Sequence, residues 1–201
     1  MRRGRQDGGT PAGLRRAFAA LRIPAPLRVP LREAQDRLRA AGARVGWTEP
    51  EDFHVTLFFF GDVPEDRVAA LREGLDGIAA RIPPFRFEIA GVGFFGPPRA
   101  PRILWARVPE VPEPMAALVG ELRDYARAGG WPVEERPFRA HVTLGRVRSP
   151  APAAALTAAA QSLTSIPFGC ATAEALSLMA AASSPGSSAR YDVIRESPLK
   201  G

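Results

Sequence analysis

One tetrapeptide occurs twice in this chain, and its two copies contain both of the chain's histidines. The copies are His54–Leu57 and His141–Leu144, and each reads His-Val-Thr-Leu. Side chains two positions apart on a β-strand point to the same face of the sheet. The sequence therefore predicts two strands of the same design. Each presents an imidazole and a hydroxyl on one face and two apolar side chains on the other.

Two imidazoles beside two hydroxyls suit proton transfer around an oxyanion. The unperturbed pKa of histidine is near 6.5, so one ring can accept a proton while the other donates one at neutral pH. Hydroxyls can donate hydrogen bonds to phosphate oxygens on which charge accumulates. We therefore hypothesise that His54 and His141 are the acid–base pair of a phosphodiester displacement, with Thr56 and Thr143 as phosphate donors. A single strand histidine or threonine is more often structural, so the matched pair carries the hypothesis.

No metal or cofactor is expected. Structural zinc uses four protein ligands and catalytic zinc usually three, whereas here two histidines stand without a paired carboxylate or cysteine. The single cysteine, Cys170, excludes an internal disulfide and fits a cytoplasmic protein. No apolar run approaches the roughly 20 residues of a membrane span. The Arg- and Gly-rich segment Met1–Gly13 lacks the apolar core of a secretory signal.

The balance of 27 basic and 21 acidic residues gives a net charge of +6. This charge favours an anionic partner, either RNA or a phosphorylated small molecule. However, Lys200 is the only lysine, and the abundance of Arg, Ala, Gly and Pro also fits the codon usage of a GC-rich genome. Charge alone does not separate these two interpretations.

The elements along the chain repeat in a simple order, because each His-Thr strand is followed by one helical pattern. Strands are predicted at Arg16–Leu21, Arg44–Thr48, Phe53–Phe60, Phe85–Phe95, Arg102–Val108, Trp131–Glu135, Arg139–Val147, Phe168–Met179 and Arg190–Glu196. Helices are predicted at Leu31–Ala41, Pro64–Ile78, Met115–Tyr125 and Ala153–Leu163. The repetition predicts an α+β fold of two pseudo-symmetric lobes around a central cleft. We expect residues 1–13 to be a disordered basic tail and residues 14–201 to form one two-lobed domain.

The two tetrapeptides and their surroundings resemble the two-histidine (2H) phosphoesterase superfamily, and within it the RNA 2′,3′-cyclic phosphodiesterases, historically named 2′-5′ RNA ligases. The resemblance spans roughly Arg16 to Leu199. It rests on the segments Arg44–Thr48, Phe53–Asp62, Phe94–Trp105, Arg136–Arg146 and Arg190–Tyr191. Two positions depart from the usual pattern: Ala140 replaces a proline, and Gly145 stands where alanine is common.

This resemblance implies two antiparallel sheet lobes with outer helices, and metal-independent hydrolysis of an RNA 2′,3′-cyclic phosphate to a 2′-phosphate. Reverse chemistry would be a 2′-5′ ligation. His54 is assigned as the acid for the O3′ leaving group and His141 as the base for water, although the sequence does not decide this order. Arg146 would bind phosphate. Trp47, Phe138 and Tyr191 are candidates for stacking on a base, with burial as the competing interpretation.

Two other functions remain open at this point. One is a non-catalytic protein that binds nucleotides or RNA ends in the same cleft. The other is a 2H esterase that acts on a different small cyclic or 2′-5′ phosphodiester. In each case we expect a monomer that requires no protein partner and no membrane.

Overall fold

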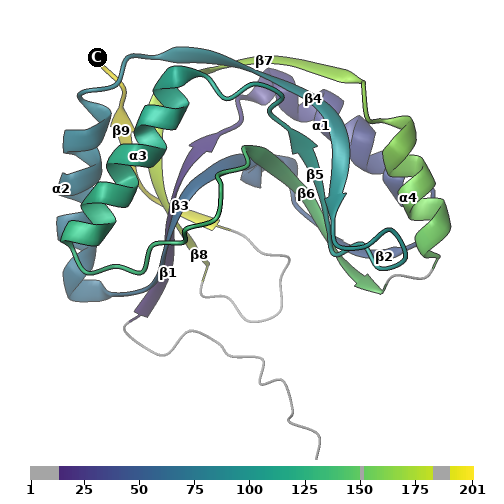
Figure 1. The fold of residues 1–201 in the computed structure, drawn as a ribbon, viewed down its shortest axis with the longest axis horizontal. Helices are drawn as coiled ribbons and strands as arrows, with labels where there is room; N and C mark the ends of the chain where they lie inside the picture. The colour runs from purple at the N-terminus through teal and green to yellow at the C-terminus, as the bar shows by residue number, and fades with distance from the viewer. Residues whose placement is uncertain (1–13, 150–151, 183–190) are drawn as a thin grey trace, which may run out of the picture.

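The computed structural model describes residues 14–149, 152–182 and 191–201 of the chain. Nine strands of this described part form one antiparallel sheet, and four helices accompany it (Figure 1). The strands are β1 (Leu14–Arg22), β2 (Arg44–Trp47), β3 (His54–Pro64), β4 (Phe85–Phe95), β5 (Ile103–Arg107), β6 (His141–Ser149), β7 (Pro167–Ala173), β8 (Ala175–Ala181) and β9 (Tyr191–Pro198). The helices are α1 (Ala25–Arg39), α2 (Val68–Ala79), α3 (Glu113–Ala128) and α4 (Ala153–Ser162), with 3-10 turns at Pro50–Asp52 and Glu65–Arg67.

The sheet consists of two halves that meet at the two histidine strands. Its order is β7-β4-β5-β6-β3-β1-β8-β9, and β2 adds to β6. The halves join where Val55 of β3 pairs with Val142 of β6, and both valines are fully buried. The predicted α+β fold of two pseudo-symmetric antiparallel lobes is confirmed. The join also sets the two tetrapeptides side by side at the centre of the molecule.

Two of the four helices, α1 and α3, pack on the half of the sheet opposite to the one from which they leave. α2 and α3 contact each other, and between them they contact β3, β8 and β9. α1 and α4 also contact each other and cover β4 and β7, although α1 follows β1 in the chain. Figure 1 shows these two pairs of helices at opposite ends of the arched sheet. Each half is therefore covered partly by a helix that leaves the other half, which ties the two halves together.

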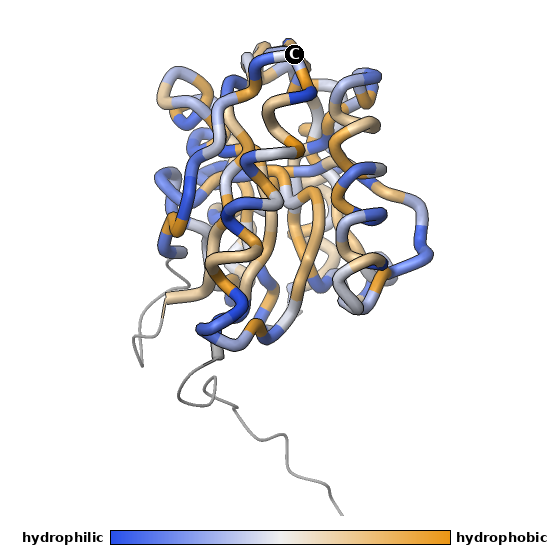
Figure 2. Tube along the Cα trace, turned by 90° about the vertical axis from the view of Figure 1, so that its left-hand side faces the viewer, coloured by the Kyte–Doolittle hydropathy of each residue, from blue (hydrophilic) through white to orange (hydrophobic). Residues whose placement is uncertain are grey.

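The main core lies between the helices and one face of the sheet. The apolar side of α2 is buried there, as are Val55, Leu57, Val142 and Leu144 of the tetrapeptides. Apolar stretches alternate with hydrophilic ones along the chain, as helices with one buried face require (Figure 2). On the opposite face, the described residues form a small buried cluster of Phe18, Ala20 and Met179, against which Tyr191 packs. This second face is where the histidine side chains lie.

Four predicted elements differ from the structure. The strand predicted at Phe168–Met179 is two strands, because β7 pairs with β4 while β8 pairs with β1, at different ends of the sheet. No strand forms at Trp131–Glu135. β3 continues beyond Phe60 to Pro64, because register shifts keep it paired with β1. α1 begins at Ala25, since the proline at its first turn lacks an N–H that would in any case be unpaired there.

Within the described residues, no helix is long and apolar enough to cross a membrane. The basic tail predicted for residues 1–13 lies outside the described residues.

Candidate active site

The two histidines occupy equivalent places on the face that the main core leaves open. Val55 and Val142 pair with their side chains in the core, so the alternating neighbours His54 and His141 point to the other face. Thr56 and Thr143 follow on the same face and are half-buried. The structure thus brings together the four residues that the repeated tetrapeptide singled out.

Both imidazoles are held in the same way. Nδ1 of His54 lies 2.6 Å from the carbonyl oxygen of Asp52, and Nδ1 of His141 lies 2.7 Å from that of Arg139. A carbonyl only accepts, so Nδ1 carries the hydrogen in each ring. Nε2 is therefore the nitrogen that remains for proton exchange with a ligand. Each ring is fixed by a backbone carbonyl two residues earlier, so the two lobes hold their histidines in the same way.

Aromatic side chains enclose each imidazole. The ring of His54 lies 5.0 Å from that of Phe18 and 5.1 Å from that of Tyr191, measured between centroids. The corresponding distances from His141 are 5.1 Å to Phe95 and 6.0 Å to Trp105. The sequence indicated Tyr191 but not the other three rings, which lie on β1, β4 and β5. Phe18 and Trp105 lie on strands that pair with a histidine strand, whereas Phe95 lies on β4, one strand further away, so no local pattern marks it.

The surroundings keep both imidazoles neutral in the free protein. Burial lowers the pKa of His54 to about 4, and the positive charges of His141 and Arg146 add to this effect. The pKa of His141 is also lowered, by burial first and then by Arg146. Because Arg146 acts on both rings, its charge lies on their side of the sheet. An anion bound between the rings would offset these effects.

A bulge in each histidine strand explains how Arg146 reaches that side. Strict alternation would place Arg146 on the face opposite to Thr143, because the two are three positions apart. On β6, however, Thr143 pairs with Trp105 and Gly145 pairs with Leu104, so Leu144 is an extra residue. On β3, in the same way, Leu57 is skipped between the paired residues Thr56 and Phe58. A bulge of this kind reverses the faces of the residues that follow it, up to the next irregularity of the strand.

The remaining predicted contacts are divided between the site and the core. Tyr191 meets His54 edge to face and belongs to the site. Trp47 packs against the core, with the guanidinium of Arg39 lying 5.0 Å from the centre of its ring. Phe138 also packs against the core. Burial, the competing interpretation, therefore accounts for Trp47 and Phe138.

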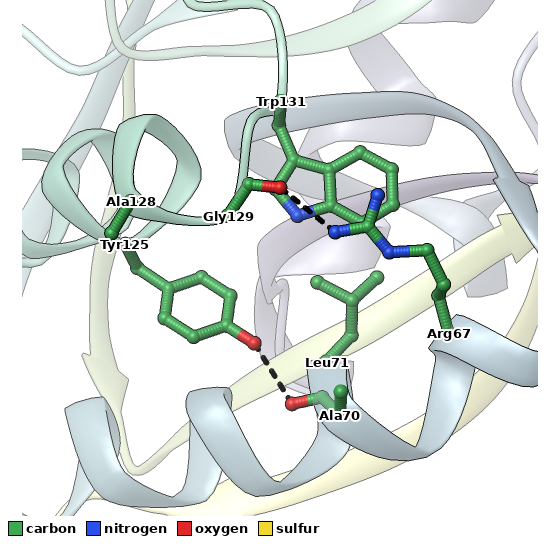
Figure 3. A pocket seen from close by; sticks show the side chains of 7 residues that line it. All are labelled: Arg67, Ala70, Leu71, Tyr125, Ala128, Gly129 and Trp131. Carbon is green, nitrogen blue, oxygen red and sulfur yellow. Dashed lines mark hydrogen bonds between the residues drawn. The ribbon is translucent and has the colours of Figure 1, made fainter.

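One pocket of the described residues lies away from the histidines. It measures about 330 Å³ and lies between α2 and the end of α3 (Figure 3). The guanidinium of Arg67 lies 3.9 Å from the ring centre of Trp131 and donates to the carbonyl of Gly129, while the hydroxyl of Tyr125 donates to the carbonyl of Ala70. The guanidinium of Arg67 and the hydroxyl of Tyr125 thus have partners within the protein, which indicates a structural contact between two helices. No group of three or more potential metal ligands occurs in the described part of the chain.

Comparison with known proteins shows which family the chain is similar to. The family described as LigT-like phosphoesterase matches residues 21–105 and 107–187. A protein of Methanothermobacter thermautotrophicus named RNA 2′,3′-cyclic phosphodiesterase is 37% identical over 136 residues, which cover 67% of this chain and 72% of that protein. A relative of the same name from Geobacillus stearothermophilus is 39% identical over 104 residues, which cover 50% of this chain but only 32% of the relative.

Solved structures show the same architecture. The crystal structure of a protein from Thermus thermophilus superposes with a TM-score of 0.78 at 26% identity, covering 92% of this chain and 98% of that one. Apo LigT of Escherichia coli has a TM-score of 0.70 at 24% identity and covers 94% of this chain and 99% of its own. At that identity the likeness to LigT demonstrates a shared fold alone.

Proposed function

Because the chain belongs to the LigT-like phosphoesterase family, we propose that it hydrolyses RNA ends that carry a 2′,3′-cyclic phosphate and leaves a 2′-phosphate. The observation that carries this proposal is the matched pose of the two imidazoles. Both are fixed through Nδ1 and both have Nε2 available on one face of the sheet. Opening a cyclic phosphodiester requires one proton to leave a water molecule and one proton to reach the departing ribose oxygen. Two opposed imidazoles provide both transfers.

The steps follow from these positions. Nε2 of neutral His141 accepts a proton as water attacks phosphorus, and protonated His54 gives its proton to O3′ as the P–O3′ bond breaks. The lowered pKa of His54 means that the bound phosphate anion must hold the proton on this ring. Thr56, Thr143 and Arg146 stabilise the charge on the non-bridging oxygens. The same steps with a ribose 5′-hydroxyl attacking in place of water would form a 2′-5′ linkage.

The ligands of this site are RNA ends or nucleotides. Solved structures of LigT from Escherichia coli contain 3′-AMP, ATP or NADP⁺, which are statements about that protein. In this chain, Tyr191 beside His54 is the candidate for a contact with the nucleoside. Both histidines come from one chain, so we propose that a monomer suffices. We also place the activity in the cytoplasm, where an exposed free thiol such as Cys170 stays reduced.

The test is hydrolysis of 2′,3′-cyclic AMP and of a short RNA with a cyclic end, both in excess chelator. We expect a 2′-phosphate product, and a loss of at least about 100-fold in kcat/KM for His54→Ala and for His141→Ala. Thr56→Val and Thr143→Val should each lower kcat about 10-fold or more. Thr172→Val is the matched control, because Thr172 is an exposed strand threonine on β7.

Three results would overturn the proposal. Activity of either histidine variant within about threefold of the wild type would exclude the two-histidine mechanism. Tight binding of cyclic-phosphate RNA without turnover would identify a binding protein. Turnover of only another cyclic or 2′-5′ phosphodiester in the same assay would identify a different 2H esterase.

A further inference from the structure

An arginine lies directly across from each histidine on the neighbouring strand. Arg22 of β1 pairs with His54, and Arg107 of β5 pairs with His141. In both arginines Nε is buried and has no hydrogen-bond partner among the described residues. Such a buried donor is costly to leave unpaired, so each position favours a partner from outside. Like the imidazole pose, this feature is repeated in the two lobes.

The two arginines differ in how their charge is balanced. Nη1 of Arg22 lies 2.8 Å from Oε1 of Glu196 and forms an ion pair with it. Within the described residues, Arg107 has no ion pair with a carboxylate. A half-buried guanidinium without a counter-ion attracts an anion more strongly than one that is already paired. Beside its histidine the second lobe therefore has an arginine without a counter-ion among the described residues, whereas the arginine of the first lobe is paired.

A pocket adjoins Arg107. It measures about 260 Å³ and shares His141 and Trp105 with the active site. Its two charged residues, Arg107 and Arg139, are both basic, and no carboxylate lines it. Nε1 of Trp105 is a second buried donor without a hydrogen-bond partner among the described residues. The pocket thus combines positive charge with two unpaired N–H groups, which is the chemistry of an anion site.

We propose that this pocket binds the phosphodiester that links the last two nucleotides of an RNA strand, while the cyclic phosphate occupies the site between the histidines. Opposed residues of paired strands have Cβ atoms about 5 Å apart, and an arginine extends well beyond that. Arg107 is therefore placed to hold a phosphate one nucleotide away from the reacting one. A guanidinium also matches a phosphate in geometry as well as in charge. The proposal rests on the proposed function and adds that oligonucleotide ends are preferred to mononucleotides.

The test compares two ligands by equilibrium binding, so it does not require turnover. One is a trinucleotide with a terminal 2′-phosphate, and the other is a mononucleoside 2′-phosphate. We expect the wild type to bind the trinucleotide at least about 10-fold more tightly than the mononucleotide. Arg107→Ala should remove most of that difference and leave mononucleotide binding within about threefold. Loss of one phosphate contact should also reduce the salt dependence of trinucleotide binding by about one ion.

Two further variants sharpen the comparison. Arg37→Ala removes an exposed arginine of α1 and should leave both affinities unchanged, which controls for net charge. Trp105→Phe keeps an aromatic, although smaller, side chain and removes the Nε1 donor, and it should weaken trinucleotide binding several-fold. If Arg107→Ala fails to fold, Arg107→Gln is the substitute, because it removes the charge but retains a polar side chain.

Equal affinity of the wild type for the two ligands would contradict the proposal of a second phosphate site. Equal weakening of both ligands by the Arg107 variants would do the same, because it would indicate a role in the catalytic site or in folding. Failure of the proposed function would appear separately, as absence of cyclic-phosphate hydrolysis by the wild type. The binding difference between the two ligands would stand or fall independently of that result.

Discussion

Phe59 lies five residues after His54, and Arg146 lies five residues after His141, so the two side chains are equivalent in the two lobes. The bulges at Leu57 and Leu144 turn both toward the histidine face. The ring of Phe59 stacks on that of Phe18 at 5.3 Å, and Phe18 in turn contacts His54. Phe59 nevertheless remains 53% exposed. The cleft thus has a cation on one side and an open aromatic face on the other.

The exposed ring of Phe59 predicts a stacking contact with a nucleobase. Phe59→Ala should weaken binding of a nucleoside 2′-phosphate about 5- to 100-fold, since base stacking on an aromatic side chain contributes about 1–3 kcal/mol. Binding of inorganic phosphate should not change, because phosphate has no base. Titration calorimetry with the two ligands measures both effects. Val29→Ala is the control, since Val29 is an apolar residue of α1 that is 62% exposed; equal weakening of both ligands would contradict the prediction.

The charge of Arg146 predicts a shift in the pH profile. Its positive charge lowers the pKa values of both histidines, so Arg146→Gln should raise both. The bell-shaped profile of kcat/KM, which reports the free enzyme, should therefore move to higher pH. Inhibition by inorganic phosphate should also weaken by about 10-fold, because a charge-assisted hydrogen bond is lost. Arg37→Gln controls for net charge. A profile that stays in place or moves to lower pH would show that Arg146 does not act on the imidazoles.

The sequence predicts the faces of residues correctly up to the first irregularity of each strand. Alternation places His54, Thr56, His141 and Thr143 on one face because the pairing is regular over those residues. Beyond each tetrapeptide the extra leucine reverses which side chains face the histidines. The apolar periodicity of the sequence does not reveal such an inserted residue. Phe58 and Phe60 are both buried, whereas Phe59 between them faces the cleft.

The partners of the histidines on other strands are hidden for a different reason. Arg22 and Arg107 lie opposite His54 and His141 only through the register of paired strands. Register depends on the whole sheet and on its turns, so a local pattern does not reveal it. The chain contains many arginines, and its composition does not show which of them lie beside a histidine. The repeated tetrapeptide, by contrast, predicts which side chains share a face, because that prediction depends only on the local geometry of a strand.

Gly145 predicts a coupled effect on stability. A Cβ at this position would lie 2.6 Å from Cγ1 of Val45 and 3.2 Å from the carbonyl oxygen of Gly46, both on β2. Gly145→Ala should therefore destabilise the fold by about 1–3 kcal/mol. Val45→Ala removes Cγ1, the atom nearest to the added Cβ. The destabilisation of the double variant should therefore be smaller than the sum of the destabilisations of the two single variants. Urea denaturation of the four proteins gives the coupling energy.

A control for this cycle comes from α3, where a Cβ at Gly120 would contact nothing within 4 Å. Gly120→Ala should be neutral or should stabilise the protein by up to about 1 kcal/mol. If Gly145→Ala behaves in the same way, close packing against β2 is not what requires a glycine at this bulge.

Burial of His54 predicts that the fold loses stability in mild acid. The pKa of His54 is about 4 in the folded protein and about 6.5 in an unfolded chain, so the unfolded chain takes up its proton first as the pH falls. The stability tied to this group is complete above about pH 6.5 and is lost progressively down to about pH 4. Between pH 7 and pH 5 the loss should be about 2 kcal/mol.

His54→Gln removes this titration while leaving a polar side chain in its place. The difference in unfolding free energy between pH 7 and pH 5, measured by urea denaturation, should therefore be about 2 kcal/mol smaller in the variant than in the wild type. His141 titrates in the same direction in both proteins, so the comparison isolates His54. Adding inorganic phosphate at pH 5 should restore part of the wild-type stability, because an anion between the rings favours their protonated forms. Identical pH dependence in the two proteins would mean that His54 is not held neutral by burial.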